Sequence, residues 1–198
     1  FILDTGKISI GGQDVTRWPE YKRAKLIARV FQDPLLGTCP SATIEQNLAL
    51  ALKRGKRRGF GPGVRARDRK HFKDELSKIS LGLENRLQDH VGLLSGGQRQ
   101  ALTMLMATLV RPEVLLLDEH IAALDPKTAA QILALTKDII ASQNLTALMI
   151  THNMRHAINF GNRLRMLHQG RLILDVRGEE KMNLAVEDLL EQFYLVQG

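Results

Sequence analysis

Residues 94–125 read LSGGQRQALTMLMATLVRPEVLLLDEHIAALD, and this stretch decides the fold. It opens with a Gly-Gly turn after Ser95, and a segment with apolar residues at helical spacing follows. A short aliphatic run comes next and is followed directly by two acids, Asp118 and Glu119. Such a run predicts a strand buried on both faces of a parallel sheet. Because ligands bind at the carboxyl ends of these strands, the two acids indicate phosphate and metal chemistry.

The segments around this strand predict an alternation of helices and parallel strands. The spacing of apolar residues predicts a helix over Gln98–Val110, and Asp125 with Pro126 marks the start of another. Thr146–Ile150 is predicted as a second buried strand, which ends at Thr151 and His152. Together these elements predict an α/β protein.

Upstream, the pattern predicts short strands and turns. Lys7–Ile10 is predicted as a strand entering a turn at the following pair of glycines, and Pro19 as the first residue of a short helix that runs to about Ile27. Ala28–Phe31 is predicted as a strand that stops at the polar Gln32. Gln32 therefore lies at a junction.

Residues 41–93 are predicted to be helical. Ser41 or Thr43 is the expected cap of the first helix, and a second, strongly charged helix is expected over Val64–Ile79. After His152, the pattern predicts a helix over Met154–Phe160, a hairpin across Gly170 and an amphipathic helix at the carboxyl end, Leu184–Tyr194.

Composition limits the class of protein. The 198 residues are 44% apolar, enough for one substantial domain, and the single cysteine, Cys39, excludes an intramolecular disulfide. No apolar run approaches the roughly 18 residues that span a bilayer, and no signal peptide is visible. The absence of Met before Phe1 indicates a fragment.

The net charge of +7 suggests an anionic partner, either nucleic acid or a membrane surface. Much of the excess lies in one block at residues 53–70, which begins with KRGKRRGFGPG and in which the only aromatic residue is Phe60. Because the block lacks a stacking platform for single strands, nucleic acid is not the expected partner. The block is expected to be a solvated loop, with contact to lipid headgroups as the alternative.

Several short motifs then identify a family. LSGGQ at Leu94–Gln98, LLLDE ending at Glu119, AALD ending at Asp125, and TH at His152 resemble the ATP-binding subunit of ABC transporters. VFQD, which contains Gln32, looks like the family's Q-loop. The resemblance covers essentially the whole chain. It implies a P-loop NTPase (RecA-like) core, a helical subdomain at 41–93 and a small antiparallel β part, within one ATPase domain over 1–198.

The resemblance also implies roles for single residues. Asp118 is similar to the Walker B aspartate near Mg²⁺, Glu119 to the general base, and His152 to the switch histidine that reaches the γ-phosphate. Gln32 is similar to the glutamine that meets Mg²⁺ and the attacking water. Taken singly, His152 could also be a polar strand end and Gln32 a loop residue.

The Gly-Gly turn resembles the signature that contacts ATP bound to an opposite subunit. Its residues are Leu94, Ser95, Gly96, Gly97 and Gln98. Independently of the resemblance, backbone N–H groups and the dipole at a helix start favour an anion there, although a Ser-Gly-Gly could also be an ordinary helix cap. Asp125 resembles the D-loop aspartate, which links the two sites of a dimer, or else is only a helix cap.

Two features depart from the family pattern. The phosphate loop G-x-x-x-x-G-K-[ST] does not occur in these residues, and the family places it upstream of Phe1. We therefore expect the N-terminal phosphate-loop segment to be missing and these residues to be inactive alone. Ile121 occupies a position where the family commonly has Thr or Ser.

Within the family, DEHIAALDPKT and the basic block look most like the ATPase of bacterial importers for tryptophan, tyrosine or other amino acids. This implies a dimeric ATPase that uses ATP and Mg²⁺, located at the cytoplasmic face of the membrane beneath a permease, with an extracytoplasmic solute-binding protein in the complex. The alternatives are a soluble ABC ATPase acting on nucleic acid or ribosomes, and a scaffold subunit that does not hydrolyse ATP.

Overall fold

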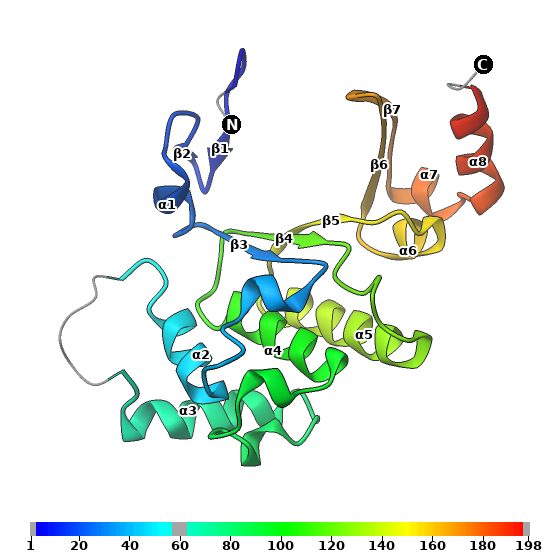
Figure 1. Ribbon diagram of the computed structural model, residues 1–198. Helices are drawn as coiled ribbons and strands as arrows, with labels where there is room; N and C mark the ends of the chain where they lie inside the picture. Colours follow the sequence, from blue (N-terminus) through cyan, green and yellow to red (C-terminus); the bar gives the residue numbers. More distant parts are fainter. Residues whose placement is uncertain (1–2, 57–62, 196–198) are drawn as a thin grey trace. The chain divides into compact units, whose positions relative to one another are not determined.

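The computed structural model describes residues 3–56 and 63–195. Contacts divide the chain into two compact units, Phe1–Ile150 and Thr151–Gly198. The first unit contains a parallel sheet with helices, and the second contains an antiparallel hairpin with three helices, α6 to α8 (Figure 1). The protein is therefore of mixed α/β class, as predicted.

A three-stranded sheet forms the centre of the first unit. Its strands are β3 (Ile27–Val30), β4 (Val114–Asp118) and β5 (Thr146–Ile150), which lie in the order β3-β4-β5. Both pairs are parallel. The predicted alternation of parallel strands and helices is confirmed, and all three strands end at the same edge of the sheet.

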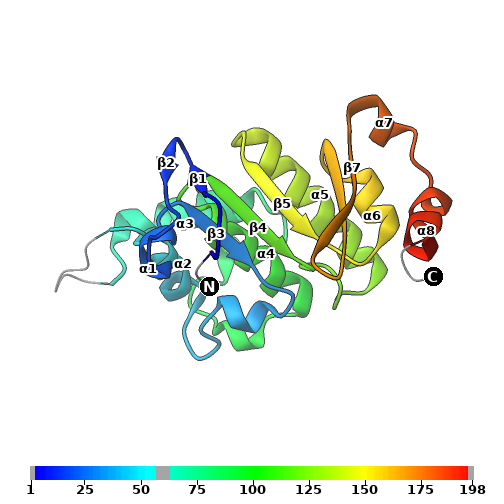
Figure 2. The ribbon, with the colours of Figure 1, turned by 90° about the horizontal axis from the view of Figure 1, so that it is seen from above.

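Two helices cover one face of this sheet. They are α4 (Gly96–Thr108) and α5 (Pro126–Ser142), which run side by side beneath the strands (Figures 1 and 2). Ala28, Leu115 and Leu117 are buried on the sheet. This face therefore supplies the apolar layer between the strands and the helices, which stabilises the first unit by removing apolar area from water.

The opposite face of the sheet differs from the prediction. Leu148 and Ile150 of β5 are each 57% exposed, and Val114 and Leu116 of β4 are only partly buried. The prediction that Thr146–Ile150 is a buried strand is therefore wrong, and β4 is fully buried on one face only. The physical reason is that β5 is an edge strand, and the described helices α4 and α5 pack on the other face.

The helical segment between β3 and α4 agrees with the prediction in type. It contains α2 (Ile44–Leu52), α3 (Ala66–Ser77) and three short 3₁₀ turns, Pro34–Gly37, Leu83–Asn85 and Val91–Leu93. Thr43, and not Ser41, caps α2 through a capping box with Gln46. The segment shares an apolar core with α4, formed by residues that include Ile44, Leu48, Phe72, Leu76 and Leu83 of the segment and Leu102 and Leu105 of α4.

The amino-terminal part of the first unit is a small hairpin followed by one helical turn. Strands β1 (Ser9–Ile10) and β2 (Gln13–Asp14) pair across two glycines with φ of 56° and 75°, values that side chains other than glycine rarely adopt. Helix α1 (Glu20–Arg23) is shorter than predicted, with Pro19 as its N-cap. It ends early because Ile27 already pairs with β4.

The second unit contains the predicted elements and one more. They are α6 (Met154–Asn159), β6 (Arg163–His168), β7 (Arg171–Arg177), α7 (Gly178–Met182) and α8 (Val186–Leu195). Helix α7 was not predicted from the sequence. It contributes Lys181, a buried lysine whose Nζ donates hydrogen bonds to the carbonyls of Ile158, Phe160 and Gly161.

The basic block is described only in part, because residues 57–62, including Arg57, Arg58 and Phe60, lie outside the described residues. Arg54 is not a solvated side chain. It donates hydrogen bonds to the carbonyls of Ala107 and Val110 near the end of α4, and burial lowers the pKa of its guanidinium. Over residues 3–56 and 63–195, no helix combines the length and apolarity needed to cross a bilayer.

Candidate functional site

The carboxyl ends of β3 and β4 bring three predicted site residues to one edge of the sheet. Val30 lies opposite Leu117 in the register, so Gln32 follows β3 at the level where Asp118 and Glu119 end β4. Gln32 is exposed, whereas the two acids are partly buried. The structure thus places these three residues at neighbouring strand ends, as expected for parallel strands.

Asp118 is paired with a residue that the sequence did not single out. One nitrogen of the Arg29 guanidinium, Nη2, lies 2.5 Å from Oδ2 of Asp118, and the guanidinium also lies 4.6 Å from the centre of the Phe31 ring. The two side chains of the ion pair are 51% and 34% exposed, so solvent screens it and it adds little stability. The ion pair matters for binding at this site, because Arg29 occupies Oδ2 of the Asp118 carboxylate.

Glu119 has an unusual backbone conformation. Its φ is +45°, in the left-handed region that costs a residue with a side chain roughly 1–2 kcal/mol. Two hydrogen bonds fix this peptide segment: the Glu119 N–H donates to the carbonyl of Ile150 at 3.0 Å, and its carbonyl accepts from Ala122 at 2.9 Å. A strained residue held at a strand end is a common feature of functional sites.

The residues after Glu119 point into the interior. His120 is 1% exposed and Ile121 is 7% exposed, and Ile121 packs in an apolar cluster with Ala101 and Ile132. At the position where the family commonly has a hydroxyl residue, this chain therefore makes apolar contacts. The buried side chains of His120 and Ile121 thus hold the turn after β4 against the interior of the first unit.

The Gly-Gly turn forms the start of α4, which begins at Gly96 and therefore two residues before the predicted start at Gln98. Ser95 is the N-cap: its Oγ accepts a hydrogen bond from the Gln98 N–H at 3.2 Å, and the Gln98 side chain accepts from the Ser95 N–H at 3.3 Å. Ser95 and Gly96 are exposed, whereas Gly97 is buried. The exposed turn presents the N-terminal end of a 13-residue helix, which favours an anion.

Gly97 is required by a close approach. A Cβ at this position would lie 2.3 Å from Cγ2 of Thr128 on α5, far inside van der Waals contact. At Gly96 the nearest such atom is Cδ2 of Leu124 at 3.5 Å, an ordinary distance. The absence of a side chain therefore matters differently at the two glycines. Gly97 allows α4 to pack closely against the first turn of α5, whereas the space around Gly96 would accept a Cβ.

Two side chains that the sequence analysis missed hold this turn. Arg99 donates to the carbonyls of Val91, Gly92 and Leu94, and so fixes the loop before the turn. The buried Gln100 donates through Nε2 to the carbonyl of Phe31 at 3.3 Å, which joins α4 to the end of β3. Their only signal in the sequence was their place directly after Gln98.

Asp125 caps α5, as predicted. Its carboxylate accepts the Thr128 N–H at 3.1 Å, and hydrogen bonding to Thr128 lowers the pKa of the Asp125 carboxyl below its ordinary value. His152 lies in the second unit, where it is exposed and precedes Asn153, the N-cap of α6.

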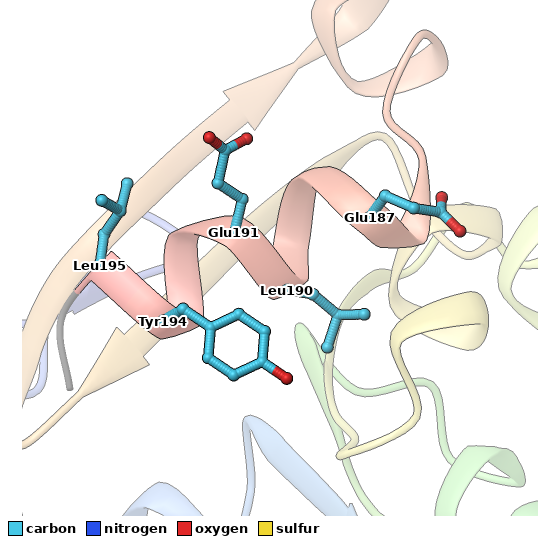
Figure 3. Close-up of a pocket in the computed structure, with 5 residues that line it drawn as sticks. All are labelled: Glu187, Leu190, Glu191, Tyr194 and Leu195. Carbon is cyan, nitrogen blue, oxygen red and sulfur yellow. The ribbon is translucent and has the colours of Figure 1, made fainter. Parts of the chain in front are cut away.

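Two hollows in the surface were compared with the positions of the predicted site residues. A shallow pocket of about 440 Å³ on α8 is lined by Glu187, Leu190, Glu191, Tyr194 and Leu195, with Leu190 and Tyr194 on the same side of the helix (Figure 3). None of these is a predicted site residue. A larger hollow of about 1860 Å³ in the first unit is lined in part by Arg29, Phe31 and Leu116.

The donor set at the sheet edge fits Mg²⁺. A carboxylate from Asp118 and an amide oxygen from Gln32 are hard oxygen ligands. Over the described residues no group of three or more His, Cys, Asp and Glu side chains could hold a metal. That is compatible with Mg²⁺ bound beside a phosphate substrate, since Mg²⁺ usually takes one or two protein carboxylates and completes its shell with phosphate and water.

Comparison with known proteins decides the family. A family model described as ABC transporter matches residues 2–122, which include Gln32, the Gly-Gly turn and both acids at the end of β4. The chain belongs to the ABC transporter family. The fold is therefore that of a P-loop NTPase, and the ATP-binding members of the family are ATPases that power transport. Asp125 and His152 lie beyond the matched residues.

Individual relatives agree with the family. The chain is similar to the tyrosine transport ATP-binding protein of Clostridioides difficile, with 48% identity over 189 residues that cover 96% of this chain and 75% of that protein. It is 35% identical to the methionine import ATP-binding protein MetN of Rhizobium etli over 86% of this chain and 45% of MetN. The chain thus spans three quarters of the first relative and less than half of the second.

Proposed function

We propose that this chain is the ATP-binding and ATP-hydrolysing part of an ABC importer, and that the solute is an amino acid. The single observation that carries the proposal is the set of Gln32, Asp118 and Glu119 at one sheet edge in a chain 48% identical to a tyrosine transport ATP-binding protein. Similarity to a methionine import protein supports the amino-acid class.

The strand ends would carry the hydrolysis. Asp118 and Gln32 would hold Mg²⁺, which when bound neutralises charge on the phosphates. Glu119 would act as the general base that accepts a proton from the attacking water, and Gln32 would orient that water. The exposed position of Gln32 and the partly exposed Glu119 leave both side chains accessible to a substrate. Positioning and charge stabilisation would supply most of the rate enhancement.

The remaining site residues would complete an ATP site that is shared between the two subunits of a dimer. Ser95, Gly96 and Gly97, with Leu94 and Gln98 beside them, would bind the γ-phosphate of ATP held by a second ATPase subunit through backbone N–H groups at the start of α4. Asp125 would link the two sites, and His152 would reach the γ-phosphate. The exposure of Ser95, Gly96 and Asp125 on the surface supports their availability to a second subunit.

The similarity to ATP-binding proteins of transporters supports a proposal for the larger assembly. We propose a single ATPase domain over 1–198, in which residues 41–93 form the helical subdomain that docks on transmembrane permease subunits. A solute-binding protein would deliver the solute on the other side of the membrane. The ATPase would sit at the cytoplasmic face of the membrane as a peripheral subunit.

Glu119→Gln in the product of the complete reading frame tests the central role. We expect ATP binding within about twofold of wild type and turnover at least about a hundredfold lower, because glutamine cannot accept the proton. Glu113→Gln is the matched control, since Glu113 lies just before the opposite end of β4 and the same amide replaces the same acid. It should hydrolyse ATP normally.

Normal turnover by Glu119→Gln would refute the general base, and equal losses in both variants would indicate a structural effect. The solute is tested separately, by uptake of radiolabelled tyrosine, tryptophan and methionine into cells that carry or lack the gene. Equal uptake of all three in both strains would reject the amino-acid proposal while leaving the ATPase proposal intact.

A further inference from the structure

His120, which directly follows the proposed base Glu119, forms a buried polar pair with a residue of α5. His120 is 1% exposed, and its Nε2 lies 3.2 Å from Oγ1 of Thr136, which is fully buried on α5. These two residues are separated by 16 positions and belong to different elements. Because a buried polar group is costly unless it is hydrogen-bonded, an apolar residue would be the simpler way to fill this space.

The direction of the hydrogen bond follows from the partners of Thr136. Its hydroxyl donates to the carbonyl of Ile132 at 2.7 Å, so its only proton is used within α5. The oxygen must then accept from His120, which places a proton on Nε2 of the imidazole. The pair is therefore directional, with His120 as donor and Thr136 as an acceptor fixed by the helix.

The adjacent residue explains what this anchor does. Glu119 has φ of +45°, and it is partly exposed, whereas the next residue, His120, is buried. A glutamate relaxes toward negative φ unless the residues around it prevent this. The hydrogen bond to Thr136 ties the residue after Glu119 to α5, the helix that Asp125 caps.

We propose that His120 and Thr136 form a positioning pair, which holds Glu119 in its left-handed conformation and thereby keeps its carboxylate aligned for the proton transfer. The proposal rests on the assignment of Glu119 as the base. Neither His120 nor Thr136 touches the substrate. They act through the backbone of Glu119, so their loss should lower kcat and leave the binding of ATP nearly unchanged.

The test uses apolar and polar replacements at both positions in the product of the complete reading frame. His120→Leu and Thr136→Val keep the volume and remove the hydrogen bond, and each should lower kcat about tenfold or more with KM for ATP within about twofold. His120→Gln and Thr136→Ser keep a donor and an acceptor, and should retain kcat within about threefold. The double variant His120→Leu/Thr136→Val should be no worse than either single one.

Thr108→Val is the matched control. Thr108 is also buried, and its hydroxyl donates to the carbonyl of Met104 four residues earlier, the same bond that Thr136 makes on α5. A general loss from burying valine would appear equally in both variants. We expect Thr108→Val to leave kcat unchanged and to melt at a temperature similar to that of Thr136→Val.

Three outcomes would overturn the proposal: wild-type kcat in Thr136→Val, equal losses in Thr136→Val and Thr108→Val, or a rise in KM that matches the fall in kcat. If His120→Leu fails to fold, Thr136→Val and His120→Gln still decide the matter. Normal turnover by Glu119→Gln would instead reject the proposed base itself. An inactive Glu119→Gln together with a fully active Thr136→Val would reject the positioning pair alone.

Discussion

The turn at Leu94–Gln98 and the end of β4 at Asp118 and Glu119 are held in place by different kinds of contact. In the turn, Ser95 and Gln98 cap the helix within three residues of each other, and Arg99 binds carbonyls at most eight residues away. At the end of β4, Asp118 pairs with Arg29 across 89 positions. The first region is fixed mainly locally, and the second by long-range contacts.

This difference has a consequence for how each region should respond to change. A turn with local hydrogen bonds keeps its geometry when distant parts of the chain move, because its partners move with it. A strand end with long-range partners depends on the packing of the whole sheet. The two regions are also connected. The buried Gln100 of α4 donates a hydrogen bond to the carbonyl of Phe31, directly after β3.

Gly97→Ala should have the largest effect, because it breaks the one close approach in the turn region that is not local. The new Cβ would lie 2.3 Å from Cγ2 of Thr128, so the Thr128 side chain must rotate or α4 and α5 must move apart. We expect a loss of about 1–3 kcal/mol in the free energy of unfolding and a Tm lower by roughly 3–10 °C. Calorimetry or thermal circular dichroism measures both.

Two further variants sharpen this prediction. Gly96→Ala meets its nearest neighbour at 3.5 Å and should be neutral. Thr128→Ser removes the opposing methyl group and should restore much of the stability of Gly97→Ala in the double variant. If Gly97→Ala were as stable as Gly96→Ala, the contact between the two helices would not be what requires a glycine there.

The same contrast explains how much could be predicted from the sequence. The caps at Thr43, Ser95 and Asp125 were predictable because each side chain binds a backbone N–H three residues later. The parallel strands β4 and β5 were predictable from their aliphatic runs. These signals are local, so one sequence is enough to read them.

Other features could not be predicted, because they depend on which distant residues the fold brings together. Arg29 gave no signal that it would pair with Asp118, and nothing marked His120 as a partner of Thr136. The exposure of Leu148 on β5 contradicts the burial predicted from its apolar character. Burial depends on which elements pack against the strand, and the strand's own sequence does not reveal them. The left-handed Glu119 likewise follows from its surroundings.

Arg29→Met should have an intermediate effect, confined to the strand end. Arg29 occupies one oxygen of the Asp118 carboxylate, so we expect that removing its charge strengthens the binding of Mn²⁺, used as a probe for Mg²⁺. The ion pair is about half exposed, which limits the expected change to about threefold in Kd. Electron paramagnetic resonance of Mn²⁺ measures the affinity without requiring turnover.

Arg111→Met is the control for the loss of a guanidinium near β4. Arg111 donates to the carbonyls of Gln143 and Asn144, and it precedes the strand's opposite end. It should leave Mn²⁺ affinity unchanged. Unchanged or weaker Mn²⁺ binding by Arg29→Met would mean that Arg29 supports the carboxylate and does not compete for it.

Asp125→Asn should have the smallest effect, and it tests a local contact that lies close to the strand end. Hydrogen bonding to Thr128 lowers the pKa of Asp125, so the stability that its ionised form contributes is present above the ordinary pKa of about 3.9 and is lost as pH falls through the lowered value. Asparagine keeps the cap but does not titrate. Wild type should therefore exceed Asp125→Asn in Tm by about 1–2 °C at neutral pH, and this difference should begin to shrink near pH 4 and disappear only below the lowered pKa.

Melting temperatures between pH 2.5 and 7 measure this difference, and Asp125→Ala provides the comparison. Alanine removes the cap itself, so this variant should be less stable than Asp125→Asn at every pH. A difference between wild type and Asp125→Asn that persists unchanged at the lowest pH would show that the ionised carboxylate of Asp125 is not the source of that difference.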